Sequence, residues 1–102
     1  MAIAEISIVP LGTGTPSVSE YVAVAIKVLQ QEEALKYELT AMGTIIEGDL
    51  DSILAVAGKM HQAVLDKGAM RVITTIKIDE RRDKMQTVTG KIDSVRGKLG
   101  RK

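Results

Sequence analysis

The spacing of apolar residues changes several times along the chain, from every second residue to every third or fourth, and this order limits the possible folds. Residues 2–11 alternate, with Ala4, Ile6 and Ile8 on one face, which predicts a half-buried strand. Residues 18 to about 33 have helical spacing on one side only, which predicts an amphipathic helix. The segment LGTGTPSVS separates the two, and Ser17 or Ser19 is expected to cap the helix.

Two short strands, a second helix and a fourth strand are expected next. Residues 37–42 alternate again, and Gly43 permits a tight reversal into a partner strand over residues 44–47. Asp49 or Asp51 can then cap a helix whose apolar positions run from 50 to 65, and Gly68 ends it. The segment RVITTIKID, residues 71–79, is the most strand-like part of the chain.

This order of elements predicts an α+β fold, a ferredoxin-like βαββαβ sandwich in which two helices cover one face of a four-stranded antiparallel sheet. The chain, residues 1–102, is expected to form one such domain. Apolar residues spaced by three and four predict an additional C-terminal helix over residues 85–99, which Gly90 and Gly97 weaken. This helix must dock at the edge of the sheet, on the sheet face that the first two helices leave uncovered, or on another subunit. Self-association is therefore expected.

The composition argues against several classes of function. With 14 Lys and Arg against 13 Asp and Glu, the net charge of +1 gives no field that would recruit nucleic acid or a membrane surface. The expected strands carry Tyr37 as their one aromatic residue, on the buried side, so base stacking is not expected either. There is no cysteine, and no apolar run approaches the ~20 residues of a membrane span. We expect a cytoplasmic protein with an aliphatic core and with neither nucleic acid nor membrane as partner.

Catalytic and metal sites are also poorly supported. The chain has one histidine, no cysteine and no serine in a strand-turn-helix elbow. His61 falls in the apolar stripe of the second helix, so we interpret it as a packed histidine bonded to a neighbouring carbonyl rather than as a base or ligand. We therefore expect no catalytic residues and no metal.

Two regions of the expected fold could bind a ligand. The sheet face opposite the helices would carry a mixture of carboxylates, hydroxyls, one ammonium group and apolar groups that suits a wet interface or a small polar ligand. Its expected residues are Glu5, Ser7, Val9, Glu38, Thr40, Met42, Ile73, Thr75 and Lys77. The glycine-containing loop before the first helix is either a structural turn or an anion-lining segment with hydroxyls from Thr13, Thr15, Ser17 and Ser19.

Three separated blocks of the sequence resemble one family. These blocks are ISIVPLGTGTPSVSEYVA, YELTAMGTIIEG and RVITTIKIDERRD, and together they cover nearly the whole chain. They are similar to a family of small thiamine-binding-like proteins of bacteria, archaea and yeast. The resemblance implies a ferredoxin-like sandwich with an extra C-terminal helix, which assembles as a homodimer and commonly as a dimer of dimers. It also implies binding of thiamine or its hydroxymethylpyrimidine moiety without catalysis, and no further cofactor.

Thiamine joins an aminopyrimidine to a cationic thiazolium, so its site needs a hydrogen-bond acceptor, hydroxyl or backbone donors, apolar walls and nearby negative charge. Residue types within the matching blocks supply each of these. The carboxylate would be Glu47 or Glu5, the hydroxyls Thr44, Thr40 and Ser19, and the walls Met42 and Tyr37. Lys77 and Arg71 would repel a thiazolium unless Glu38, Glu5 or Asp79 pairs with them, and they would suit a phosphorylated thiamine.

Two other functions remain open besides thiamine binding. One is a small acylphosphatase-like hydrolase that uses Arg71 and the glycine loop as a phosphate cradle. Such an enzyme needs an asparagine to orient water, and the sequence contains none. The other is a structural or regulatory oligomer that senses a different metabolite.

Overall fold

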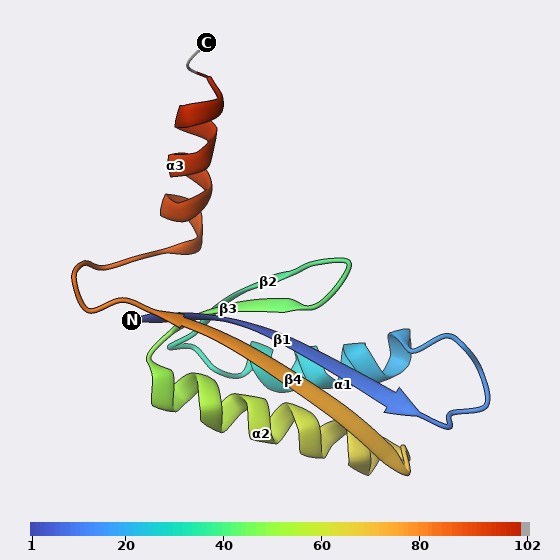
Figure 1. Ribbon diagram of the computed structural model, residues 1–102. Coiled ribbons are helices and arrows are strands. Elements are labelled where there is room, and N and C mark those ends of the chain that lie inside the picture. Colours follow the sequence, from blue (N-terminus) through green and yellow to red (C-terminus); the bar gives the residue numbers. More distant parts are fainter. Residues whose placement is uncertain (101–102) are drawn as a thin grey trace.

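The computed structural model describes residues 1–100, and their sheet has four antiparallel strands in the order β2-β3-β1-β4 (Figure 1). The strands are β1 (Ala2–Leu11), β2 (Lys36–Leu39), β3 (Thr44–Gly48) and β4 (Arg71–Glu80). The helices are α1 (Ser19–Gln30), α2 (Leu50–Lys67) and α3 (Val88–Leu99), and the first two lie together on one face of the sheet. The predicted ferredoxin-like fold with an added C-terminal helix is confirmed.

Most element boundaries agree with the sequence pattern, and three differ for identifiable reasons. α1 ends at Gln30 because the next two amides, of Gln31 and Glu32, turn back to Val28 and Leu29. β2 ends at Leu39 rather than at residue 42, because the Thr40 hydroxyl bonds Gly43 and closes a turn. α3 begins at Val88 rather than at residue 85, because the Thr87 hydroxyl accepts the Gly90 amide.

The predicted cap of α2 is confirmed, whereas the predicted cap of α1 is wrong. Asp49 caps α2 by accepting the amide of Ser52, and Gly68 follows the helix with φ at 125°. At α1 the expected serine cap is wrong, because the N-cap residue is Val18 and no side chain bonds the helix amides. The Ser17 and Ser19 hydroxyls lie 3.5 Å from each other instead.

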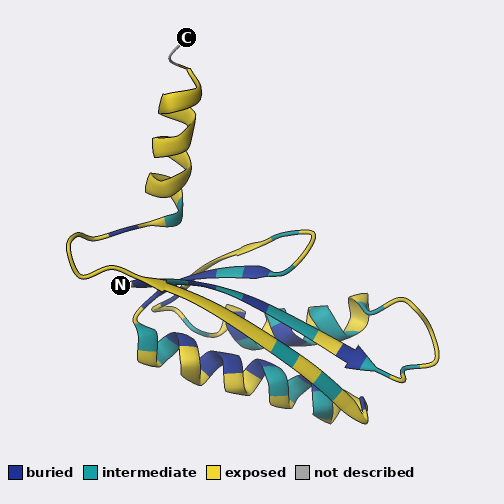
Figure 2. Cartoon of the chain, viewed as in Figure 1, coloured by how far each residue is buried: buried dark blue, intermediate teal, exposed yellow. Residues whose placement is uncertain are grey.

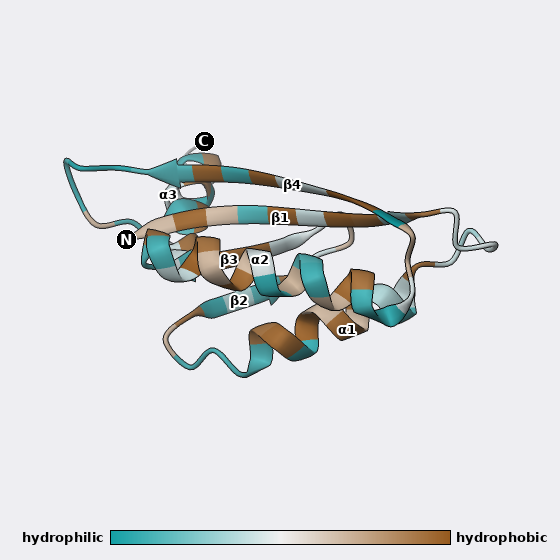
Figure 3. Ribbon diagram, turned by 90° about the horizontal axis from the view of Figure 1, so that it is seen from below, coloured by the Kyte–Doolittle hydropathy of each residue, from teal (hydrophilic) through white to brown (hydrophobic). Residues whose placement is uncertain are grey.

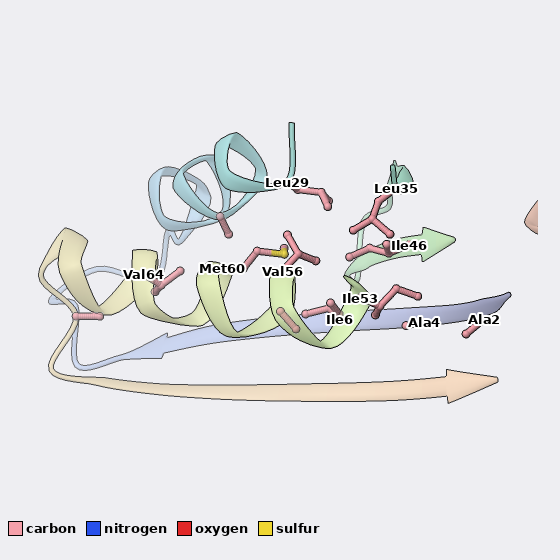
Figure 4. Close-up of a cluster of buried hydrophobic side chains, with 13 residues drawn as sticks. Ala2, Ala4, Ile6, Leu29, Leu35, Ile46, Ile53, Val56, Met60 and Val64 are labelled. Carbon is pink, nitrogen blue, oxygen red and sulfur yellow. The ribbon is translucent and has the colours of Figure 1, made fainter. Parts of the chain in front are cut away.

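An aliphatic core fills the space between the sheet and its two helices, as expected from a chain without Phe or Trp. Figure 4 shows Ile6 and Ile46 of the sheet clustered with Leu29 of α1 and with Val56 and Met60 of α2. Ala2 and Ala4 line the same face of β1, and their small side chains let α2 approach the central strand closely. The core therefore fixes which face of β1 is turned away from the helices.

The C-terminal helix stands apart from this sandwich. All residues of α3 after Val88 are exposed, and Figures 1 and 2 show the helix projecting from the end of β4. Its base is held by Gln86, which donates to the Asp79 carbonyl at 2.8 Å, and by Lys91, which donates to the Asp79 carboxylate at 2.6 Å. Beyond its first turn the helix packs neither along the edge of its own sheet nor across the open face, and docking on another subunit stays a prediction.

A substitution at Gly48 tests the close packing at the end of β3. A Cβ at this position would overlap the Cδ2 atom of the buried Leu35, so Gly48→Ala should lower the free energy of unfolding by about 1–3 kcal/mol. Gly58→Ala is the matched control, because no atom lies near its Cβ position in α2 and the change should stabilise the helix by about 0.5–1 kcal/mol. Urea denaturation measures both, and equal effects would contradict the packing argument.

A second test separates the two aspartates at the start of α2. Asp49→Ala removes the side chain that accepts from the amide and hydroxyl of Ser52, and it should cost about 1 kcal/mol of stability. Asp51→Ala removes only a charge in the first helical turn and should cost less, about 0.3–1 kcal/mol. Thermal unfolding compares the variants, and a larger loss at Asp51 would disprove the assignment of the cap.

Candidate functional site

The sheet face turned away from the helices carries charged and apolar side chains in two rows that cross all four strands. The rows follow from the strand register, because residues directly opposite one another point to the same face. In the order β2, β3, β1, β4, the first row is Lys36, Glu47, Ile3 and Asp79, and the second is Glu38, Ile45, Glu5 and Lys77. This open face thus joins residues from every strand.

The centre of these rows is a square of two carboxylates and two isoleucines on β3 and β1. Glu47 lies opposite Ile3, and Glu5 lies opposite Ile45, so the carboxylates occupy one diagonal and the isoleucines the other. Diagonal neighbours on adjacent strands are about 7–8 Å apart, a span that one small molecule can bridge. The square therefore presents two acceptors with apolar surface between them.

Two hollows lie over this square and share Ile45 as a wall. The larger has a volume of about 580 Å³ and is lined by Ile3, Ala4, Glu5, Ile45, Lys77, Ile78, Asp79 and Glu80. The smaller has a volume of about 180 Å³ and is lined by Lys36, Tyr37, Glu38, Ile45, Glu47, Val88 and Thr89. Because the last two residues begin α3, the first turn of that helix forms one side of the smaller hollow.

The net charge of the open face favours a cationic ligand. Its two rows hold four carboxylates and two ammonium groups, so their net charge is negative. Lys77 lies 4.0 Å from Glu5, and both are well exposed, so this ion pair is weak. The hydrogen bond from Lys91 holds the pKa of Asp79 below its usual value, with further help from Gln86 and Arg81.

Glu47 differs from the other carboxylates of the face because it is only 9% exposed. Within residues 1–100 its side chain has no ion pair or hydrogen-bond donor, although the ammonium of Lys36 belongs to the neighbouring position in the row. A carboxylate that has little exposure and no donor within the protein is free to accept a hydrogen bond from a ligand. Glu47 is the strongest acceptor candidate of the site on this ground.

The structure brings some of the predicted site residues together and separates others. Glu5 and Glu47 share the central square, and Tyr37 lines the smaller hollow. Thr44 is buried on the helix side of β3, opposite Ile6. The remaining three lie off the open face, Thr40 and Met42 in the turn between β2 and β3 and Ser19 at the start of α1.

Sequence reasoning missed several residues that line the hollows. Ile3, Ile45 and Lys36 reach the site through the register between strands, and Val88 and Thr89 reach it through the position of α3. Of the expected open-face residues, those on β1 and β4 and Glu38 on β2 do share that face, whereas Thr40 and Met42 do not. Only the alternation within β1 and β3 could have signalled Ile3 and Ile45 in advance.

Other sequence candidates lie outside the open face. The glycine loop turns with positive φ at Gly12 and Gly14 and is tied by a bond from the Thr13 hydroxyl to the Thr15 carbonyl. His61 is half-buried, and its Nδ1 lies 2.6 Å from the Thr74 hydroxyl, so it is a packed histidine as expected, bonded to a hydroxyl rather than to a carbonyl. Across residues 1–100, no helix has the length and apolar character needed to cross a bilayer.

Comparisons with known proteins extend over nearly all of the chain. The chain is 52% identical to the protein YqgV of Bacillus subtilis over 98 residues, which cover 93% of this chain and 94% of that one. It is 38% identical to the protein ECM15 of the fungus Eremothecium gossypii over 97 residues, covering 95% and 91% of the two chains. A crystal structure of a hypothetical protein from Methanocaldococcus jannaschii has 46% sequence identity and a TM-score of 0.86, covering 92% of this chain and 94% of that one.

The predicted family is confirmed, with relatives in bacteria, archaea and a fungus. Residues 4–96 match the sequence profile described as thiamine-binding protein, a span that begins in β1 and ends within α3. It includes both hollows of the open face except for Ile3. On these matches, the chain belongs to the thiamine-binding protein family.

Proposed function

We propose that the protein binds thiamine or its hydroxymethylpyrimidine moiety on the open face of the sheet, without changing it chemically. The observation that carries this proposal is the square of Glu5, Glu47, Ile3 and Ile45, which offers two carboxylates and two apolar contacts within the span of a small molecule. Membership of the thiamine-binding protein family directs the choice of ligand.

The two parts of thiamine match different features of the face. Glu47 is covered and can accept a hydrogen bond from the exocyclic amino group of the pyrimidine, with Ile45 against the ring. The negative balance of the two rows favours the thiazolium cation, and the larger hollow beside Glu5 has room for it. Hydroxymethylpyrimidine alone would use only the first of these contacts.

Lys77 and Asp79 set the preference among charged forms of the ligand. Lys77 is paired with Glu5 and Asp79 with Lys91, so neither group is a free charge in the larger hollow. Because the weak Lys77 pair is the more easily opened, a phosphorylated thiamine could draw its ammonium away from Glu5. Titration with thiamine phosphate tests this secondary proposal, and equal affinity for thiamine and its phosphate would remove it.

Calorimetric titration of the ligand-stripped protein with thiamine, hydroxymethylpyrimidine and thiamine phosphate tests the main proposal. We expect saturable binding of at least one of them. Glu47→Gln should weaken it about 10- to 100-fold, because a hydrogen bond to a charged acceptor is worth about 1.5–3 kcal/mol. Glu5→Gln should weaken thiamine more than hydroxymethylpyrimidine, because only thiamine carries the cation.

Glu20→Gln provides the matched control, because this exposed carboxylate lies in the first turn of α1, away from the open face. It should bind each ligand as the unchanged protein does. If none of the three ligands gives a heat of binding, the proposed function is refuted. If Glu47→Gln and Glu5→Gln both bind with unchanged affinity, the site lies elsewhere.

A further inference from the structure

The first turn of α3 lies against the open face, although the rest of that helix is exposed. Figures 1 and 3 show α3 on the opposite side of the sheet from α1 and α2, at the end where β1 begins and β4 ends. Val88 and Thr89 of this turn line the smaller hollow together with Ile45 and Glu47 of β3. The hollow therefore has one wall from the sheet and another from α3.

Hydrogen bonds to the end of β4 hold this turn in place. Gln86 is only 6% exposed, and it donates to the Asp79 carbonyl. Lys91 donates to the Asp79 carboxylate, and its ammonium group also lies 3.5 Å from the Oε1 atom of Gln86. Because the residues of α3 beyond Val88 are exposed, these bonds fix where Thr89 lies relative to the sheet.

Thr89 supplies the hydroxyl group that a pyrimidine site needs. The three hydroxyls expected from the sequence lie off the open face. Of the residues that line the two hollows, only Tyr37 and Thr89 carry a hydroxyl group, and Tyr37 is opposite the core residue Ile46, which places its side chain on the helix side of β2. No hydrogen bond within residues 1–100 engages the Thr89 hydroxyl, whereas Thr87 caps the helix.

We infer that Thr89 determines the specificity for the pyrimidine, because its hydroxyl donates to a ring nitrogen while the Glu47 carboxylate accepts from the neighbouring amino group. An aminopyrimidine presents these two groups side by side on one edge, so a donor and an acceptor that line the same hollow can recognise both. Glu47 is 9% exposed and has no ion pair within residues 1–100. This inference rests on the proposed function and names the residues that recognise the ring.

The sizes of the two hollows agree with this assignment. The smaller, at about 180 Å³, lies below the range of about 300–1,000 Å³ that is typical of a pocket for a whole ligand, whereas the larger, at about 580 Å³, lies within it. Since Ile45 lines both, one ligand can place its pyrimidine in the smaller hollow and the rest in the larger. Thr89 would then contact the ring that hydroxymethylpyrimidine and thiamine share.

Calorimetric titration of Thr89→Val with hydroxymethylpyrimidine and with thiamine tests the inference. Valine keeps the branched shape but removes the donor, so the affinity for both ligands should fall by the same factor, about 3- to 10-fold, as expected for one neutral hydrogen bond. Thr89→Ser keeps the hydroxyl and should bind as the unchanged protein does. Thr75→Val is the matched control, because this exposed threonine lies on the open face but lines neither hollow.

A double-mutant cycle tests Lys91 as a positioning residue. Lys91→Met removes the bond to the Asp79 carboxylate and should weaken hydroxymethylpyrimidine binding, because Thr89 is then held less firmly. In a Thr89→Val background the same change should have little further effect, since the hydroxyl that it positions is absent. Lys98→Met, in the exposed last turn of α3, is the control and should leave the affinity unchanged.

Unchanged affinity in Thr89→Val, with weakened binding in Glu47→Gln, would overturn the inference and leave the proposed function standing. A loss in Lys36→Met without a loss in Thr89→Val would also overturn it, because the Lys36 ammonium is the other donor that lines the smaller hollow. Additive effects in the cycle would disprove the positioning role of Lys91. If the unchanged protein binds neither ligand, the inference and the proposed function are both refuted.

Discussion

Burial of one face of β1 is the constraint on which the rest of this structure depends. Ala2, Ala4 and Ile6 lie under the helices with almost no exposure, and β1 pairs with both β3 and β4. A shift by one residue would turn Glu5 into an aliphatic core, where a charge without a partner is strongly unfavourable. The core therefore fixes Ile3 and Glu5 on the open face and, through the register, decides which residues of the other strands join them.

This division between the two faces of the sheet decides which side chains the open face carries. The helix side of the sheet is almost wholly aliphatic, so the polar groups of the strands gather on the other side. There Glu47 has little exposure while Glu5 and Lys77 stay well exposed, which gives one face both a nearly buried acceptor and a solvated ion pair.

Much of the fold could be predicted from local patterns. The limits of β1, the start of β4 and both signals at the ends of α2, Asp49 and Gly68, follow from residue types within a few positions. The errors were also local. The sequence favours a serine cap where Val18 stands, and its alternation extends the second strand through Thr40 and Met42, although the Thr40 hydroxyl closes the turn with Gly43. Side-chain bonds to nearby backbone compete with strand pairing, and alternation alone does not reveal them.

The sequence by itself determined the order of elements, the family and the face on which Glu5 would lie, because periodicity and capping depend on neighbours along the chain. Only the tertiary structure decided that Glu5 and Glu47 form one square with Ile3 and Ile45, that Thr44 turns inward, and that α3 leaves its own sheet. The first two outcomes depend on the pairing of β1 with β3, which are far apart in the sequence. Such contacts are set by the packing of whole layers, which no local pattern encodes.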